Sequence, residues 1–219
     1  MSEISTRAFE LLSQLRENNN KEWFEGNKSE YQNLVRKPFA DLLESLSAEL
    51  QKHGLEYLGS EKTMFRVNRD VRFSLDKSPY STHVSGVLTP SGTKSEVSPL
   101  IYLHMESEGG FAVAGVYHPT SERLDGIRQA IIENEDEFSK VLISLESAGL
   151  ALDASEATKN MPRAFTGHAD HIHAGAVKLK NLMVRTEIAP SDWQSKKLIA
   201  TLSEFAVQAK PLLDFLKRH

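Results

Sequence analysis

Apolar residues recur at three- and four-residue steps in the first quarter of the chain, and this spacing predicts amphipathic helices. Phe9, Leu12 and Leu15 mark the buried face of the first helix. Three asparagines at residues 18–20 are expected to end it, because their amides compete for backbone hydrogen bonds and favour caps and turns. Three amides exceed what one cap requires, so they could also line a polar pocket, although a turn between two helices explains them more simply. Gly54 is the expected end of this helical region.

The middle of the chain changes to short segments rich in β-branched and aromatic residues, which predict strands. The polar segment 89–99 predicts a long hairpin loop, and the glycine pair at 109–110 is expected to close the next hairpin. A further strand is expected later in the chain, over Val177–Ile188. The strands predicted in the middle are Thr63–Asn68, His83–Leu88, Leu100–Met105 and Phe111–Tyr117.

Helical spacing returns after Pro119 and again after Pro190, and Pro211 is expected to interrupt the last helical stripe. Helices therefore come first, strands cluster in the middle, and helices follow. Because this order does not alternate strand with helix, it predicts an α+β fold with a mainly antiparallel central sheet flanked by N-terminal and C-terminal helices. Without an internal repeat or a long linker, residues 1–219 are expected to form a single α+β domain.

The composition is that of an ordinary globular protein, with 40% hydrophobic and 26% charged residues in 219. The absence of cysteine excludes disulfides, thiolate nucleophiles and cysteine-based zinc sites. No apolar run approaches the roughly 20 residues of a membrane helix. The first residues also lack the hydrophobic core of a secretory signal. A cytoplasmic protein without membrane affinity is therefore expected.

Positive charge is concentrated in one short part of an acidic chain. The net charge is −4, whereas residues 62–77 hold five basic and two acidic residues, a local charge of +3 that leaves −7 elsewhere. Nucleic-acid binding draws on an excess of lysine and arginine over a broad surface, so a nucleic-acid partner is unlikely by this distribution. A local site for a small anionic molecule is the better prediction.

The basic stretch Phe65–His83, together with Asn18–Phe24 and Asn27–Tyr31, resembles a family of conserved hypothetical proteins, the domain of unknown function 2461. The resemblance covers nearly the whole chain and implies one α+β domain, but it implies no activity. The segment His168–His173 departs from the family's pattern, because it carries extra histidines. Further matching pieces are Gly115–Tyr117, Arg128 with Ile131, Met161–Phe165 and Leu179-Lys180.

The residue types of the basic stretch favour an anion site. Arginine offers a planar fork of donors that fits carboxylate or phosphate oxygens. A strand ending near Asn68 would free Arg69 and Arg72 to turn toward a common point. At least two of the three arginines are then expected to share a concave surface with a lysine or histidine of the same stretch. The predicted ligand-binding residues are Arg66, Arg69, Arg72, Asp76, Lys77 and Tyr80, and His83 is the predicted catalytic residue if the chain is an enzyme.

Two other hypotheses remain open. The chain could be a protein-interaction or assembly module in which Asp70 and Asp76 neutralise a structural arginine stretch, since ion-pair networks imitate functional sites. Weak nucleic-acid contact is the third, and a steep salt dependence would identify it. Under the ligand hypothesis, Arg72→Ala weakens anion binding and leaves the fold intact. No cofactor is expected from any of the three.

A histidine cluster lies outside the basic stretch. His168, Asp170, His171 and His173 are of ligand types that suit Zn²⁺, Ni²⁺ or Cu²⁺. The segment lacks an H-E-x-x-H pattern and is flanked by glycine and alanine, so no stoichiometric metal is predicted. The G-x-S-x-G elbow of hydrolases and the glycine-rich phosphate loops are also absent from the sequence.

Overall fold

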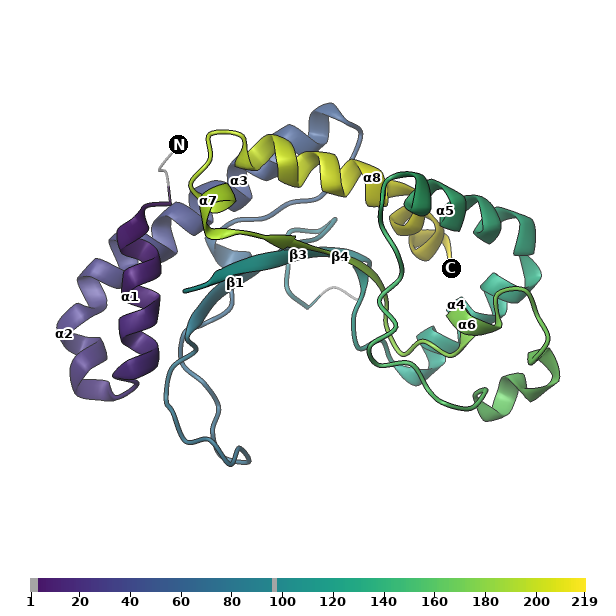
Figure 1. Ribbon diagram of the computed structural model, residues 1–219, viewed down its shortest axis with the longest axis horizontal. Helices are drawn as coiled ribbons and strands as arrows, with labels where there is room; N and C mark the ends of the chain where they lie inside the picture. The colour runs from purple at the N-terminus through teal and green to yellow at the C-terminus, as the bar shows by residue number, and fades with distance from the viewer. Residues whose placement is uncertain (1–3, 96–97) are drawn as a thin grey trace. The chain divides into compact units, whose positions relative to one another are not determined.

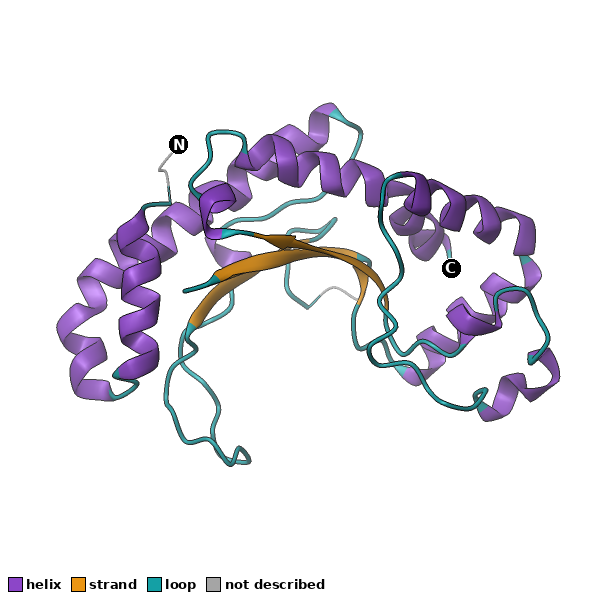
Figure 2. Ribbon diagram, viewed as in Figure 1, coloured by secondary structure: helices purple, strands orange, loops and turns teal. Residues whose placement is uncertain are grey.

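The computed structural model describes residues 4–95 and 98–219 (Figure 1). Half of the chain is helical and 16% is strand (Figure 2), and the four strands form one antiparallel sheet in the order β1-β2-β3-β4. The predicted α+β class with a central antiparallel sheet is therefore confirmed. The strands are β1 (His83–Leu88), β2 (Leu100–Glu106), β3 (Gly109–Val116) and β4 (Leu182–Ile188).

The described residues pack into two compact units. The first comprises the residues up to 95 together with Tyr102–Ala112 and Glu187–Glu204. The second comprises residues 98–101, Val113–Thr186 and Phe205–His219. Strands β2, β3 and β4 each contribute residues to both units. The single domain predicted over residues 1–219 stays a prediction.

The first unit begins with the predicted N-terminal helices. Helix α1 (Thr6–Glu17) buries Phe9, Leu12 and Leu15, which confirms its apolar stripe. The side chain of Asn20 caps α2 (Lys21–Tyr31) by accepting a hydrogen bond from the backbone N–H of Trp23. A π-helical turn, η1 (Gln32–Arg36), leads into α3 (Lys37–Lys52).

Helix α3 packs against strand β1 within the first unit. Gly86 in β1 allows this close approach, because a Cβ atom there would lie 2.7 Å from a Cδ atom of Leu43. Alternate residues of β2, such as Leu103 and Met105, are fully buried, whereas Tyr102 and His104 are only half-buried. The period-two pattern thus leaves aromatic and polar side chains on the second face.

The second unit contains further helices and the longer part of the C-terminal helix. Thr120 caps α4 (Ser121–Glu133) by accepting from the backbone N–H of Arg123. Helix α5 (Glu135–Ser147) starts with three acidic residues, which favour the positive end of a helix. The remaining helices are η2 (Glu61–Thr63), η3 (Arg163–His168), α6 (Ala174–Val177), α7 (Pro190–Trp193) and α8 (Leu198–Arg218). None of the described helices is long and apolar enough to cross a membrane.

Two predicted strands are wrong in extent. Thr63–Asn68 forms only isolated bridges after η2, and the bridges Met64–Gly86 and Asn68–Tyr80 differ in register by two residues, so no continuous ladder forms. The strand predicted from Val177 begins only at Leu182. The reason is a side chain: Arg128 donates to the carbonyl oxygens of Val177 and Leu179, and the residues up to Val177 are helical.

Two predicted breaks also lie elsewhere. Helix α8 continues through Pro211. The carbonyl that loses its helical partner belongs to Val207, which is exposed and can be solvated. The turn between β2 and β3 is formed by residues 107–108, and Gly109 and Gly110 begin β3 with positive φ values of 125° and 156°.

Candidate functional site

The arginine-rich stretch forms a closed loop in the first unit. The backbone N–H of Arg69 donates to the carbonyl oxygen of Pro79 at 2.9 Å, and that of Ser81 donates to Val67 at 2.7 Å. With the bridge between Asn68 and Tyr80, these bonds join the two ends of the loop. We call residues 69–79 the basic loop. Figure 1 shows it extending from the start of β1.

Arg69 points back along the base of the basic loop and is mostly covered. Its Nη1 atom lies 2.5 Å from Oδ2 of Asp76 and donates to the carbonyl oxygen of Ser78 at 3.0 Å. Its Nε and Nη2 atoms make no hydrogen bond with any described residue. The hydroxyl and backbone N–H of Ser78, with Arg69, lower the pKa of Asp76 to about 2. The pair therefore stays ionised at neutral pH, with one edge of the guanidinium still unbound.

The other basic residues of the stretch do not join Arg69. Arg72 forms a two-bond pair with Asp70, at 3.0 and 2.7 Å, and remains exposed. Lys77 donates to the carbonyl oxygen of Val71 at 2.9 Å. Arg66 lies on the exposed surface. The expectation that two of the three arginines share one concave surface is wrong, because only Arg69 reaches it.

The turn between α1 and α2 reaches the end of the basic loop. The amide of Asn19 donates to the carbonyl oxygen of Tyr80 at 2.8 Å and accepts from its backbone N–H at 3.1 Å. Asn18 bonds the carbonyl oxygen of Gln14, and Asn20 caps α2, so each of the three amides has its own partner. The two bonds of Asn19 fix this turn, which follows Arg16 of α1, against the residues that precede β1.

These elements enclose a cavity of about 340 Å³ in the first unit. Arg16 and Asn19 come from α1 and the turn after it, and the other residues come from the basic loop, the segment before β1 and the first residue of β1. Arg16 is half-exposed and pairs with Glu108 at 3.0 Å. The lining residues are Arg16, Asn19, Arg69, Asp76, Ser78, Tyr80, Ser81, Thr82 and His83.

The hydroxyl groups of Tyr80, Ser81 and Thr82 belong to the cavity wall. Tyr80 is only 5% exposed, and its ring stacks on that of Phe24 with 4.1 Å between centroids. Among the described residues, no hydrogen bond is made by the side chains of Tyr80, Ser81 or Thr82. Ser81 and Thr82 are half-buried, and none of the three hydroxyls is enclosed without a partner, so these groups are open to water or to a polar ligand.

His83 lies where the cavity meets the sheet. Its ring stacks on His104 at 4.1 Å, and His104 stacks on Phe111 at 4.6 Å, so three strands contribute to one column of rings. Burial lowers the pKa of His83; the charge of Arg69 lowers it further, and Glu106 opposes both. His83 is therefore neutral at pH 7 and can accept a proton.

The structure thus brings together four of the seven residues predicted from the sequence: Arg69, Asp76, Tyr80 and His83. Their roles stay predictions. The residues that sequence reasoning missed are Arg16, Ser78, Ser81 and Thr82. The run of hydroxyl residues from 78 to 82 was visible in the sequence. No signal connected Arg16 to a loop more than fifty positions away.

Comparison with known proteins identifies the family. The sequence model of a family described as conserved hypothetical protein (DUF2461) matches residues 7–215. The chain belongs to this family. No curated protein and no solved structure matches the chain. The function must therefore be inferred from the cavity and the residues that line it.

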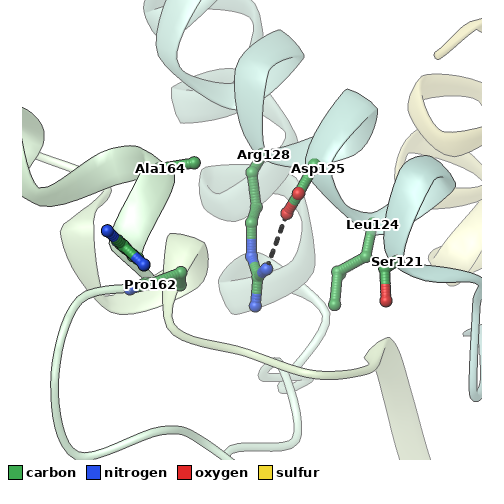
Figure 3. Close-up of a pocket in the computed structure, with 7 residues that line it drawn as sticks. Ser121, Leu124, Asp125, Arg128, Pro162 and Ala164 are labelled. Atoms are coloured by element: carbon green, nitrogen blue, oxygen red, sulfur yellow. Dashed lines mark hydrogen bonds and ion pairs between the residues drawn. The ribbon is translucent and has the colours of Figure 1, made fainter.

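The second unit has a larger cavity, of about 630 Å³, beside the first turns of α4 (Figure 3). Its arginine, Arg128, is committed to the protein: it donates to Asp125 at 2.9 Å and to the carbonyl oxygens of Val177 and Leu179 at 2.8 and 3.0 Å. Leu124 of α4 and Pro162 line the cavity as well. These contacts give Arg128 a structural role, joining α4 to the segment before β4.

The histidine cluster also has protein partners within the second unit. His173 is buried; its Nε2 atom lies 2.9 Å from the hydroxyl of Ser139 and 3.1 Å from the carbonyl oxygen of Glu135. The Nε2 atom of His171 lies 3.1 Å from the carboxylate of Glu135. In residues 4–95 and 98–219, no three histidine or carboxylate side chains are grouped to hold a metal ion. The predicted absence of a stoichiometric metal stays a prediction.

Proposed function

We propose that the cavity of the first unit binds a small molecule that carries a phosphate or carboxylate group. The proposal rests on one observation: Arg16 and Arg69, from elements far apart in the sequence, line the same cavity. Asp76 is the one carboxylate among the described residues that line this cavity. Guanidinium groups form strong, directed hydrogen bonds with such anions. Asp76 balances Arg69, and Glu108 balances Arg16 from outside the cavity wall, so a positive charge becomes available when a ligand displaces Glu108.

Both guanidinium groups remain available to a ligand. The partner of Arg16, Glu108, is 74% exposed, and exposed ion pairs are worth at most about 1 kcal/mol. An anion can therefore replace Glu108 without leaving a buried charge unpaired. Arg69 does not need to leave Asp76, because its Nε and Nη2 atoms offer a second edge. That edge is held in place by the bonds of Nη1.

His83 is the residue of this cavity best suited to proton transfer. It lines the same space as Arg69 and is a neutral base at pH 7, because burial lowers its pKa. In a reaction, the arginines would stabilise negative charge on the substrate and His83 would take or return the proton. The cytoplasmic location expected from the sequence is part of this proposal.

Calorimetric titration of sulfate into the full chain tests the proposed binding. Sulfate keeps its double negative charge between pH 5 and pH 8, so the result does not mix protein and ligand titration. One saturable site per chain is expected, with an affinity that falls moderately as sodium chloride is added. Heats no larger than those of dilution, at all sulfate concentrations, would rule out the proposal.

The affinity for sulfate is expected to rise as the pH falls below about 6.5. The pKa of His83 lies below its ordinary value of 6.5, so protonation sets in on the acid side of that value and adds a positive charge beside Arg69. The measurement is sulfate affinity from pH 8 to pH 5 in the wild type and in His83→Gln. The rise should be lost in the variant. An equal rise in both proteins would show that His83 does not contact the anion.

A second candidate function is assembly, and the tip of the basic loop favours it. Phe73 and Leu75 are fully exposed there, while the pairs Arg72–Asp70 and Arg69–Asp76 brace the loop. Exposed apolar side chains on a structured loop are typical of a contact surface. The occupant that fits is a second copy of the chain, because the stretch 62–77 carries +3 and the remainder carries −7.

This candidate predicts self-association that depends on the loop tip. Sedimentation equilibrium of the wild type should show a dimer that weakens with salt, and the double variant Phe73→Ser, Leu75→Ser should be monomeric with an unchanged circular dichroism spectrum. A wild type that is monomeric up to millimolar concentration excludes assembly through the loop.

A further inference from the structure

We infer that the ligand of the first unit's cavity is a polyhydroxylated anion, of the class of sugar phosphates and sugar acids. This inference rests on the proposed function, because it concerns the same cavity and the same arginines. It adds the chemistry of the rest of the ligand, beyond its anionic group.

The cavity offers no purely apolar wall. All nine residues that line it have polar side chains. Pockets for drug-like or apolar ligands are instead lined mostly by hydrophobic and aromatic side chains. The two rings present, those of Tyr80 and His83, already stack on Phe24 and His104. An alkyl or aromatic body would consequently leave the surrounding polar groups without partners.

The hydroxyl groups of the cavity wall match a ligand with hydroxyl groups of its own. Each side-chain hydroxyl of Tyr80, Ser81 and Thr82 donates one hydrogen bond and accepts others, as a sugar hydroxyl does. Tyr80 is nine-tenths buried and held by Phe24 and by the two bonds from Asn19. Its position is therefore fixed before a ligand arrives, which lowers the entropic cost of binding.

In a site for a polyhydroxylated anion, Asp76 can bind the hydroxyl groups of the ligand, whereas in a site for a simple anion it has no ligand group to bind. A carboxylate repels an anion, but it accepts hydrogen bonds from neutral hydroxyls. Asp76 is held by Arg69 and by the backbone N–H of Ser78 at 2.9 Å, and it is exposed enough to reach a ligand. A molecule with an anionic group near the arginines and hydroxyls near Asp76 uses both signs of charge. The volume, about 340 Å³, suits a compact ligand of this kind.

The experiment compares ligands of equal charge that differ only in hydroxyl groups. Glycerol 3-phosphate is titrated against propyl phosphate, and gluconate against hexanoate, with inorganic phosphate as the reference. The hydroxylated member of at least one pair is expected to bind about tenfold more tightly or better, which corresponds to one or two net hydrogen bonds. The pair with the larger ratio tells whether phosphate or carboxylate is the anionic group.

Variants show which side chains produce the difference in affinity between the two ligands of a pair. Thr82→Val and Ser81→Ala remove the hydroxyls of the wall and should bring the ratio toward one, whereas Ser144→Ala, exposed on α5 of the second unit, should leave it unchanged. If inorganic phosphate binds but both members of each pair bind equally, the polyhydroxyl inference is wrong and the anion site stands. If neither inorganic phosphate nor any member of the two pairs binds, the proposed function fails, and this inference fails with it.

Discussion

Replacing Arg69 with alanine is expected to lower the affinity for sulfate by about 10- to 100-fold. A hydrogen bond to a charged group contributes about 1.5–3 kcal/mol, and each 1.4 kcal/mol corresponds to a factor of ten. The substitution also leaves Asp76 without its basic partner in the cavity, so its negative charge opposes the anion. Calorimetry of the wild type and the variant at one ionic strength measures the loss.

Arg72→Ala is the matched control, because Arg72 lies in the same loop and is also paired with an aspartate, Asp70, but does not line the cavity. Its sulfate affinity should stay within about twofold of the wild type, since exposed pairs contribute little. This expected result differs from the sequence-based one, which placed Arg72 in the site, because Arg72 does not line the cavity. Equal losses in both variants would mean that the loop's total charge, and not the cavity, attracts the anion.

Arg128→Met is expected to lower the free energy of unfolding by about 2–6 kcal/mol, because two buried carbonyl groups lose their hydrogen-bond donor. The side chain of Arg128 is only 8% exposed and makes three hydrogen bonds. Without it, the carbonyl oxygens of the buried residues Val177 and Leu179 lose their donor, and an unsatisfied buried group costs about 1–3 kcal/mol. Urea denaturation followed by far-ultraviolet circular dichroism measures the change.

The control for this prediction is Asp125→Asn. Asp125 is about half-exposed, so its carboxylate is hydrated once the pair is broken, and a loss of no more than about 1 kcal/mol is expected. Sulfate binding should be the same in both variants, because the anion cavity belongs to the other unit. If Arg128→Met lowers the free energy of unfolding by no more than Asp125→Asn does, the hydrogen bonds to the two carbonyl groups do not hold α4 in place.

Much of the fold could be predicted from local patterns. The stripe of Phe9, Leu12 and Leu15 specifies α1, and the period-two segment His83–Leu88 specifies β1 to the residue. The segment after η2 could not be predicted, because its register is set by pairing with residues that follow the basic loop. The start of β4 could not be predicted either, since it depends on where a side chain of α4, Arg128, places its donors.

The candidate site was predictable only where it is contiguous in sequence. The density of charged residues marks the basic loop and its neighbours in the sequence, so Arg69, Asp76, Tyr80 and His83 could be predicted as site residues. The choice of Arg69 over Arg72 depends on backbone geometry, because the bond between the N–H of Arg69 and Pro79 turns one side chain inward and leaves the other in solvent. Arg16 enters the cavity only through the packing of α1, which no local pattern reports.

The central claim is that Arg16 and Arg69 together hold an anionic group. The most direct measurement is a crystal structure of the full chain grown with selenate, whose anomalous scattering locates the anion without ambiguity. Selenate is expected in the cavity, within hydrogen-bonding distance of both guanidinium groups and near His83. Selenate found only at exposed arginines such as Arg66 or Arg72, with the cavity free of anomalous signal, would contradict the proposed site.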